Sequence, residues 1–188
     1  GSVEGNRIWG KELRLPLRYV EWAPDCQTIL FITNDAEAIL YSADGNKIRT
    51  FDMVAQDRGA MGEIDVGGIA WHAAASHSVL VRSGGACDKA PNLCIAFADG
   101  KVQLTKDTDP NSQVIIFDTQ MSIVTTKWNK LGTIIAFAGT SAPDSKEAGK
   151  PCLKFYSCYG RPLRQLKVTG EKISSMSWEG GSLRVALS

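Results

Sequence analysis

The repeat that decides the fold is Ser42-Ala43-Asp44-Gly45-Asn46-Lys47-Ile48, which follows a close copy at Ser2-Val3-Glu4-Gly5-Asn6-Arg7-Ile8. The glycines of these two copies are 40 residues apart. A third, looser copy is Phe155-Tyr156-Ser157-Cys158-Tyr159-Gly160-Arg161-Pro162-Leu163. Each copy sets a glycine between two short apolar runs, where a tight β-hairpin needs a positive φ angle. The chain therefore repeats one hairpin-containing unit.

Four tryptophans form a second repeating pattern along the chain. Each of them ends a short run in which apolar and polar residues alternate. They are Trp22, Trp71, Trp128 and Trp178, at intervals of 49, 57 and 50 residues. A WD-repeat blade has about 40–45 residues, so each interval also carries loop insertions. Because the tryptophans hold equivalent places, we expect them to be structural residues of the blade core rather than a ligand-stacking cage. We expect the same structural role, in hairpin turns, for Gly5, Gly45, Gly100 and Gly160.

A single repeat has the pattern of four short strands joined by turn residues. The expected strands are 19–22, 28–33, 38–42 and 47–51, then 68–71, 93–97, 101–105 and 114–118, then 124–128, 133–137, 152–157 and 163–168. Such strands suit a propeller blade or a β-sandwich, and the fixed period with its tryptophan register favours the propeller. Helical periodicity is almost absent. The predicted fold class is all-β, a partial WD40-like β-propeller with four antiparallel strands per blade.

The repeats predict one propeller over residues 1–188. Its expected parts are the end of a blade at 1–15, full blades at 16–66, 67–119 and 120–170, and the start of a blade at 171–188. Three exposed loops are expected at 52–66, 72–92 and 140–151, since these stretches are rich in small and polar residues. About three full blades make an open ring, so we expect the 188 residues alone to associate through uncovered blade faces rather than persist as a monomer.

Composition restricts the class of protein. Hydrophobic residues are 44% and charged residues 22% of the 188, as in ordinary globular proteins. The net charge of +1 gives no field favouring nucleic acid or more than peripheral membrane contact. The longest apolar runs are too short to cross a bilayer, and no signal segment is evident. Five cysteines without a Cys-x-x-Cys pair indicate reduced thiols and a cytoplasmic location.

Candidate chemistry is sparse, so we assign no catalytic, cofactor-binding or metal-binding residue and expect no cofactor and no enzyme activity. The possible zinc ligands His72, His77, Cys87 and Cys94 fit no recognised spacing. No Gly-x-Ser-x-Gly nucleophile motif or phosphate-binding loop is present. A basic cluster, Lys11, Arg14 and Arg18, is diluted by neighbouring glutamates and favours a solvated strand edge.

Both ends of the chain resemble a known family. Residues 1–13, from Gly1-Ser2-Val3-Glu4 to Lys11-Glu12-Leu13, resemble the first propeller of the WD repeat-containing protein 35 family, and residues 168–181 resemble its last blade. The middle is similar more loosely, through Gly67-Gly68, Ala98-Asp99-Gly100 and Lys127-Trp128-Asn129. The chain has no Gly-His or Trp-Asp dipeptide, and degenerate repeats of this kind are usual in the family.

The resemblance implies a non-catalytic scaffold, because the family's members are subunits of intraflagellar transport complex A. It implies a role in retrograde ciliary or flagellar transport and cargo entry, with other complex A subunits and ciliary cargo proteins as partners. The implied locations are the cytoplasm, the ciliary base and the cilium or flagellum. Two alternatives remain open: a WD-repeat scaffold of another trafficking or coat complex, and a propeller hydrolase. A hydrolase would gather polar residues and a strongly shifted titratable group at the central channel.

Overall fold

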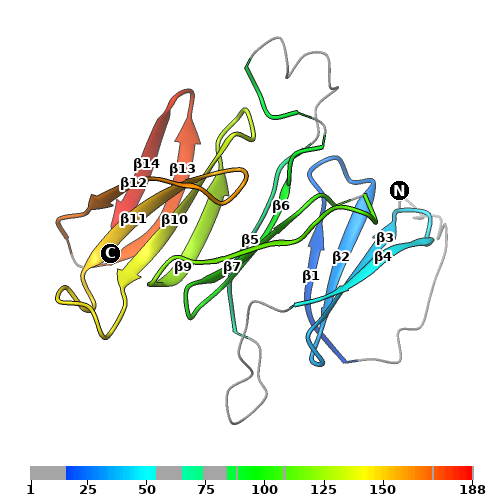
Figure 1. Cartoon of the computed structure of the whole chain (residues 1–188), viewed down its shortest axis with the longest axis horizontal. Coiled ribbons are helices and arrows are strands. Elements are labelled where there is room, and N and C mark those ends of the chain that lie inside the picture. Colours follow the sequence, from blue (N-terminus) through cyan, green and yellow to red (C-terminus); the bar gives the residue numbers. More distant parts are fainter. Residues whose placement is uncertain are drawn as a thin grey trace, which may run out of the picture. The chain divides into compact units, whose positions relative to one another are not determined.

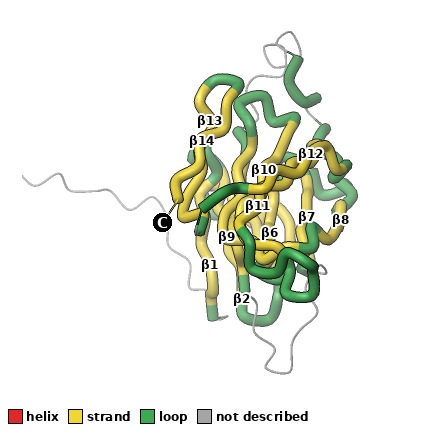
Figure 2. Tube along the Cα trace, turned by 90° about the vertical axis from the view of Figure 1, so that its left-hand side faces the viewer, coloured by secondary structure: helices red, strands yellow, loops and turns green. Residues whose placement is uncertain are grey.

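The structure of the chain is a computed structural model, which describes residues 16–53, 65–73, 84–87, 89–107, 109–170 and 172–187. It divides into two compact units, residues 1–53 and residues 54–188. In the described ranges the regular elements are strands, without a helix (Figure 2). Those ranges accordingly hold no helix capable of crossing a membrane. The expected blade end at 1–15, with Gly5, and His77 lie outside the described residues.

The first unit contains one four-stranded antiparallel sheet whose strands neighbour one another in chain order (Figure 1). Its strands are β1 (Leu17–Trp22), β2 (Thr28–Thr33), β3 (Glu37–Ser42) and β4 (Lys47–Asp52). The β2 sequence is a nearly continuous apolar run, which suits a strand buried on both faces, and five of its six residues are buried. The exposed strand β1 forms one edge of this sheet.

The second unit contains two more sheets of the same plan and a two-stranded sheet. The first consists of β5 (Val66–Trp71), β6 (Leu93–Phe97), β7 (Lys101–Thr105) and β8 (Ile115–Asp118). The next consists of β9 (Met121–Trp128), β10 (Ile134–Ser141), β11 (Pro151–Ser157) and β12 (Pro162–Lys167). A hairpin of β13 (Ile173–Glu179) and β14 (Ser182–Leu187) follows. All pairs are antiparallel and follow chain order, which confirms the predicted architecture of four-stranded antiparallel sheets.

The hairpin repeat folds in the same way in both units. In the β3–β4 turn, Ser42 N donates to Asn46 O at 2.8 Å and Gly45 N donates to Ser42 O at 2.9 Å. In the β11–β12 turn, Ser157 N donates to Arg161 O at 2.8 Å, and the glycine N–H again donates back to the serine carbonyl. The serine of each turn also accepts, through Oγ, the N–H of the residue that follows the glycine. The loose copy is therefore a structural repeat of the close one.

Two strand boundaries differ from the sequence prediction by three residues or more. Strand β9 begins at Met121, three residues before the expected start, and β10 continues to Ser141 rather than ending at 137. The loop expected at 140–151 shrinks to 142–150. The cause is a close approach: a Cβ on Gly139 would overlap the carbonyl oxygen of Ser122. Only glycine lets the small, polar end of β10 pair with the start of β9.

The core of the second unit lies in the seams between successive sheets. Strand β5 lies beside β9, and β9 lies beside β13. The first seam buries residues of both flanking sheets, namely Ala70, Cys94, Ala96, Val102, Leu104, Met121, Ile123, Ile135, Phe137, Cys152 and Tyr156. A second cluster joins Ala136, Ala138 and Leu153 of one sheet to Ile173 and Met176 of the hairpin. Each sheet is therefore a layer that packs face to face on the next.

Candidate functional site

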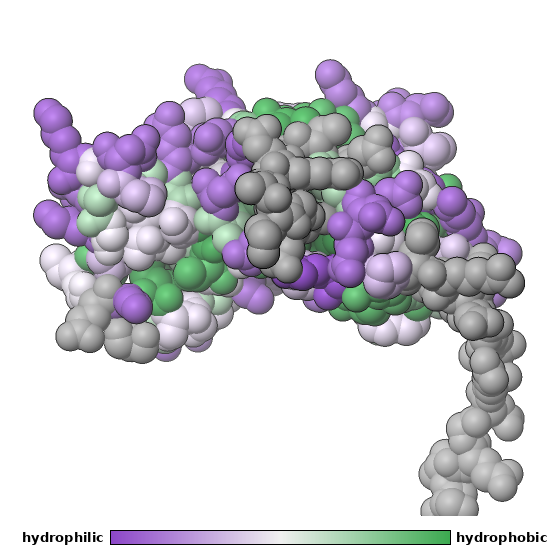
Figure 3. Space-filling model, turned by 90° about the horizontal axis from the view of Figure 1, so that it is seen from below, coloured by the Kyte–Doolittle hydropathy of each residue, from purple (hydrophilic) through white to green (hydrophobic). Residues whose placement is uncertain are grey.

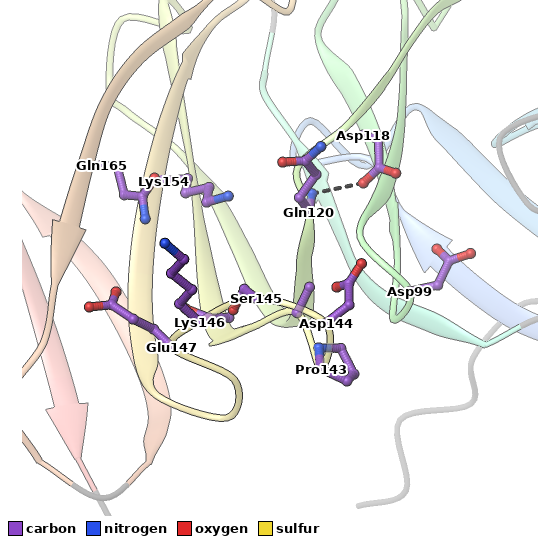
Figure 4. A pocket seen from close by; sticks show the side chains of 12 residues that line it. Asp99, Asp118, Gln120, Pro143, Asp144, Ser145, Lys146, Glu147, Lys154 and Gln165 are labelled. Atoms are coloured by element: carbon purple, nitrogen blue, oxygen red, sulfur yellow. Dashed lines mark hydrogen bonds between the residues drawn. The ribbon is translucent and has the colours of Figure 1, made fainter.

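A polar cleft opens beside the first residues of strand β9. Its volume is about 790 Å³, and it lies between the turns of one sheet and the β10–β11 loop of the next (Figure 4). The cleft is lined by Asp99, Asp118, Gln120, Ser141, Ala142, Pro143, Asp144, Ser145, Lys146, Glu147, Lys154 and Gln165. On the face shown in Figure 3, hydrophilic side chains project outward and hydrophobic surface shows between them.

The connection between β8 and β9 forms one wall and is held rigidly. Thr119 is buried, and its backbone N–H and its hydroxyl both donate to Gly100 O, at 2.9 and 2.7 Å. Gln120 adopts a φ of 54°, and its N–H donates to Asp118 Oδ1 at 2.7 Å. Gly100 has a φ of 102°, and a Cβ there would overlap Met121 O. The connection therefore presents Asp118 and Gln120 at fixed positions.

The opposite wall is the loop that closes the β10–β11 hairpin. Ser141 N donates to Lys150 O at 2.9 Å, and Gly149, with a φ of 75°, donates to Ser141 O at 3.2 Å. The loop is also joined to β12, because Lys167 Nζ lies 2.6 Å from Glu147 Oε1. The hydrogen bond from Lys167 lowers the pKa of the Glu147 carboxyl. The loop is thus a closed, hydrogen-bonded structure.

Both walls of the cleft carry charged side chains. Asp99, Asp118 and Asp144 lie toward one side in Figure 4, and Lys146 and Lys154 lie toward the other. None of the three aspartates forms an ion pair with a described residue. Lys154 Nζ donates to the carbonyl of Thr119 and so joins the two walls. Sequence analysis placed these residues in strands, turns or an exposed loop. They come together only through pairing between distant strands.

Three of the four tryptophans donate their indole N–H to groups outside their own strand. Trp71 Nε1 donates to Asp107 Oδ2 at 2.8 Å, Trp128 Nε1 to Ala70 O at 3.0 Å, and Trp178 Nε1 to Lys127 O at 3.3 Å. Trp128 and Trp178 are partly buried and pack against the two seam clusters.

Trp22 differs from the other tryptophans, because it is 51% exposed within the first unit. Its expected place in a blade core therefore stays a prediction. Of the four glycines expected in hairpin turns, the structure describes Gly45, Gly100 and Gly160, and their φ angles are positive, between 80° and 102°. A Cβ on Gly160 would lie 2.9 Å from the Phe117 ring. These glycines lie in the β3–β4, β6–β7 and β11–β12 turns.

The described residues that were considered as zinc ligands each make different contacts. His72 Nε2 contacts Lys130 O at 2.9 Å, and Cys87 Sγ lies 3.4 Å from the Tyr159 hydroxyl. The contact with Cys87 raises the pKa of Tyr159 to about 12. Cys94 is buried in β6, where burial raises its thiol pKa. The described residues include no group of three or more acidic, histidine or cysteine side chains placed to hold a metal ion.

The stacked four-stranded antiparallel sheets, joined in chain order, define a β-propeller of the WD-repeat scaffold class. The chain belongs to the WDR35/TULP4 N-terminal β-propeller family, whose model matches residues 1–188. It is 34% identical over 191 residues to WD repeat-containing protein 35 of Homo sapiens and 34% identical over 188 residues to that of Rattus norvegicus. Each match covers the whole chain and 15% of the relative.

A solved structure gives the same fold at low sequence identity. The β-propeller domain of Cps50 (Swd1) from Myceliophteria thermophila superimposes with a TM-score of 0.58 and 13% identity. The superposition covers 91% of this chain and 50% of that one. The likeness supports the propeller fold, and the family match supports a protein-interaction scaffold.

Proposed function

We propose that this chain is part of a subunit of intraflagellar transport complex A and acts there as a non-catalytic scaffold. The protein would serve retrograde ciliary or flagellar transport and the entry of cargo into the cilium. The observation that carries the proposal is the 34% identity to human WD repeat-containing protein 35 across the whole chain. Because the chain spans 15% of that relative, the proposal concerns the full protein to which the propeller belongs.

The proposed partners are the other complex A subunits and ciliary cargo proteins, met in the cytoplasm, at the ciliary base and in the cilium. The polar cleft supports a role in protein contact, since its walls carry aspartates that form no ion pair with a described residue and lie on rigid backbone. A net charge of +1 supports a protein partner over nucleic acid.

The chemistry of the cleft supports a non-catalytic role. Glu147 is already bonded to Lys167, and the Lys154 ammonium group already donates to the Thr119 carbonyl. Both groups stabilise the walls instead of standing ready to transfer a proton to a substrate.

The test is affinity purification of the tagged full-length protein from ciliated cells, followed by mass spectrometry and imaging of the tag. We expect complex A subunits to co-purify and the tag to concentrate at the ciliary base and along the axoneme. A matched variant replaces residues 142–150 by a short glycine-containing turn, which should keep the fold because loop closure depends weakly on length. Loss of a single partner with this variant would assign that partner to the cleft.

Co-purification with a vesicle-coat complex, without complex A subunits, would overturn the proposal in favour of a scaffold in another trafficking assembly. Hydrolysis of a substrate by the purified protein, lost when the cleft residue Asp118 is changed to Asn, would overturn the non-catalytic role.

A further inference from the structure

A second pocket lies at the other end of β9, where the strand finishes. Its volume is about 380 Å³, enough for one or two side chains. The pocket is lined by Lys127, Trp128, Lys130, Met176, Ser177, Trp178 and Gly180. These residues come from the end of β9, the β9–β10 turn, β13 and the β13–β14 turn. The pocket therefore lies at a seam, on the end of β9 opposite the polar cleft.

The two tryptophans of this pocket offer apolar surface at fixed positions. The indole N–H of Trp128 is bonded to Ala70 O, and that of Trp178 is bonded to Lys127 O. Trp178 also packs edge-to-face on Phe155, with ring centroids 6.1 Å apart. Because both indole N–H groups already have acceptors, a ligand that contacts the two tryptophans meets ring carbons rather than hydrogen-bond donors.

The charges at this pocket have one sign. Lys127 and Lys130 are its charged lining residues, both are exposed, and neither forms an ion pair with a described residue. Glu179 follows Trp178 in the chain but is paired with Arg184, whose Nε lies 2.9 Å from its Oε2. The carboxylate nearest to the pocket in the sequence, that of Glu179, is therefore paired with Arg184. The ammonium groups of Lys127 and Lys130 remain available to a ligand.

We propose that this pocket docks an acidic segment of a partner protein. Aspartate or glutamate side chains of the segment meet Lys127 and Lys130, and an apolar side chain between them packs on Trp128 and Trp178. Exposed ion pairs alone contribute little, so the apolar contact supplies affinity and the lysines supply selection. The inference rests on the scaffold function proposed above and gives it a partner chemistry.

The charge pattern favours an acidic peptide over a nucleic acid. Nucleic-acid sites carry a stripe of cations that follows a phosphate backbone. Here two lysines flank a small apolar pocket, and the chain as a whole carries a net charge of only +1.

The experiment measures binding to the full-length protein by fluorescence anisotropy, with a dye-labelled peptide of alternating glutamate and leucine as probe. Peptides with glutamine or lysine in place of glutamate, and a single-stranded oligonucleotide, serve as comparisons. The test variant is K127E/K130E. The matched control, K150E/K172E, makes the same charge change at two exposed lysines outside the pocket. Circular dichroism and the melting temperature verify that both variants fold.

We expect K127E/K130E to lower the affinity for the glutamate peptide at least about tenfold and the control to change that affinity less than about twofold. Added salt should also lower the affinity. Equal binding by the test variant, no binding of the glutamate peptide, or tighter lysine-dependent binding of the oligonucleotide would each overturn the inference. The complex A purification reports separately on the proposed function. If the peptide binds but complex A subunits do not co-purify, the proposed function alone is overturned. If complex A subunits co-purify but the peptide does not bind, only this inference is overturned.

Discussion

Trp128 and Trp178 hold equivalent places in successive repeats, and each donates its indole N–H to the residue that precedes the previous tryptophan. Trp128 bonds to Ala70, just before Trp71, and Trp178 bonds to Lys127, just before Trp128. The acceptor is a backbone carbonyl in both cases, so the hydrogen bond itself does not require a particular side chain at that position. The same bond can therefore recur in repeats whose residues before the tryptophan differ.

Replacing Trp128 by alanine in the 188-residue chain should lower the free energy of unfolding by about 3 kcal/mol, because a large seam side chain and its hydrogen bond are lost. Trp22→Ala is the matched control, since Trp22 is 51% exposed, and should cost under about 1 kcal/mol. Urea denaturation of both variants measures the difference. Equal losses would show that Trp128 does not stabilise the seam.

The Glu147–Lys167 pair predicts a dependence on pH. The pKa of Glu147 is lowered in the folded chain, mainly by the hydrogen bond from Lys167. Its stabilising effect is therefore complete above the ordinary glutamate pKa of about 4.3 and is lost as the pH falls through the lowered value. Lys167→Gln should raise the pKa of Glu147, and Lys172→Gln should leave it unchanged. NMR titration of the Glu147 carboxyl carbon checks both, and a shift in the control alone would contradict the pairing.

At the scale of the strands, close contacts between backbones decide where elements begin and end. Gly67 and Gly68 of β5 face β9, and a Cβ on Gly68 would lie 3.0 Å from Thr126 Cγ2. Gly139 of β10 faces Ser122 in the same way. Glycine in these strands thus permits close approach and does not interrupt pairing.

Gly139→Ala tests this role of glycine within a strand. The new Cβ would overlap the Ser122 carbonyl, so strands β9 and β10 must separate locally, at an expected cost of about 1–3 kcal/mol or more. Gly181→Ala is the control, because a Cβ there meets nothing within 4 Å and its φ is not positive. Thermal unfolding of the two variants measures the contrast. An unchanged melting temperature for Gly139→Ala would mean that the strands can give way freely.

Sequence reasoning succeeded where local chemistry determines structure. The Asp99-Gly100 turn allowed the strands Leu93–Phe97 and Lys101–Thr105 to be predicted residue for residue. It failed at Gly139, because the overlap with Ser122 that selects glycine is made by a residue on another strand. The cleft could not be predicted for the same reason: Asp99, Asp118 and Asp144 come together only through long-range pairing.

At the scale of the second unit, the two ends of β9 present different chemistry. The start of the strand lies at a cleft with aspartates that form no ion pair with a described residue. Its end lies at a pocket lined by two tryptophans and by two lysines that likewise form no ion pair with a described residue. An eight-residue strand separates them by roughly 26 Å. The two sites can therefore be occupied by different partners at the same time.

Thiol labelling reports on the folding of the second unit, because the three buried cysteines all belong to it. Cys26 and Cys87 are exposed, whereas Cys94, Cys152 and Cys158 are buried and have thiol pKa values raised by burial. Since the thiolate is the reactive form, a brief pulse of alkylating reagent at neutral pH should label the first two in the folded chain. The other three should react only as denaturant unfolds it. Peptide mass spectrometry gives the site of labelling, and rapid labelling of Cys94 without denaturant would contradict the buried seam.

The first seam cluster draws its residues from both flanking sheets, and this has a consequence for cooperativity. Neither sheet can complete its own core, so each is stable only while its neighbour is in place, as in a row of coupled units. Loss of order in the β9–β12 sheet therefore removes the support of both the sheet before it and the hairpin after it. Unfolding that begins in the β9–β12 sheet therefore extends to its neighbours on both sides. A partner bound at either end of β9 would oppose that unfolding.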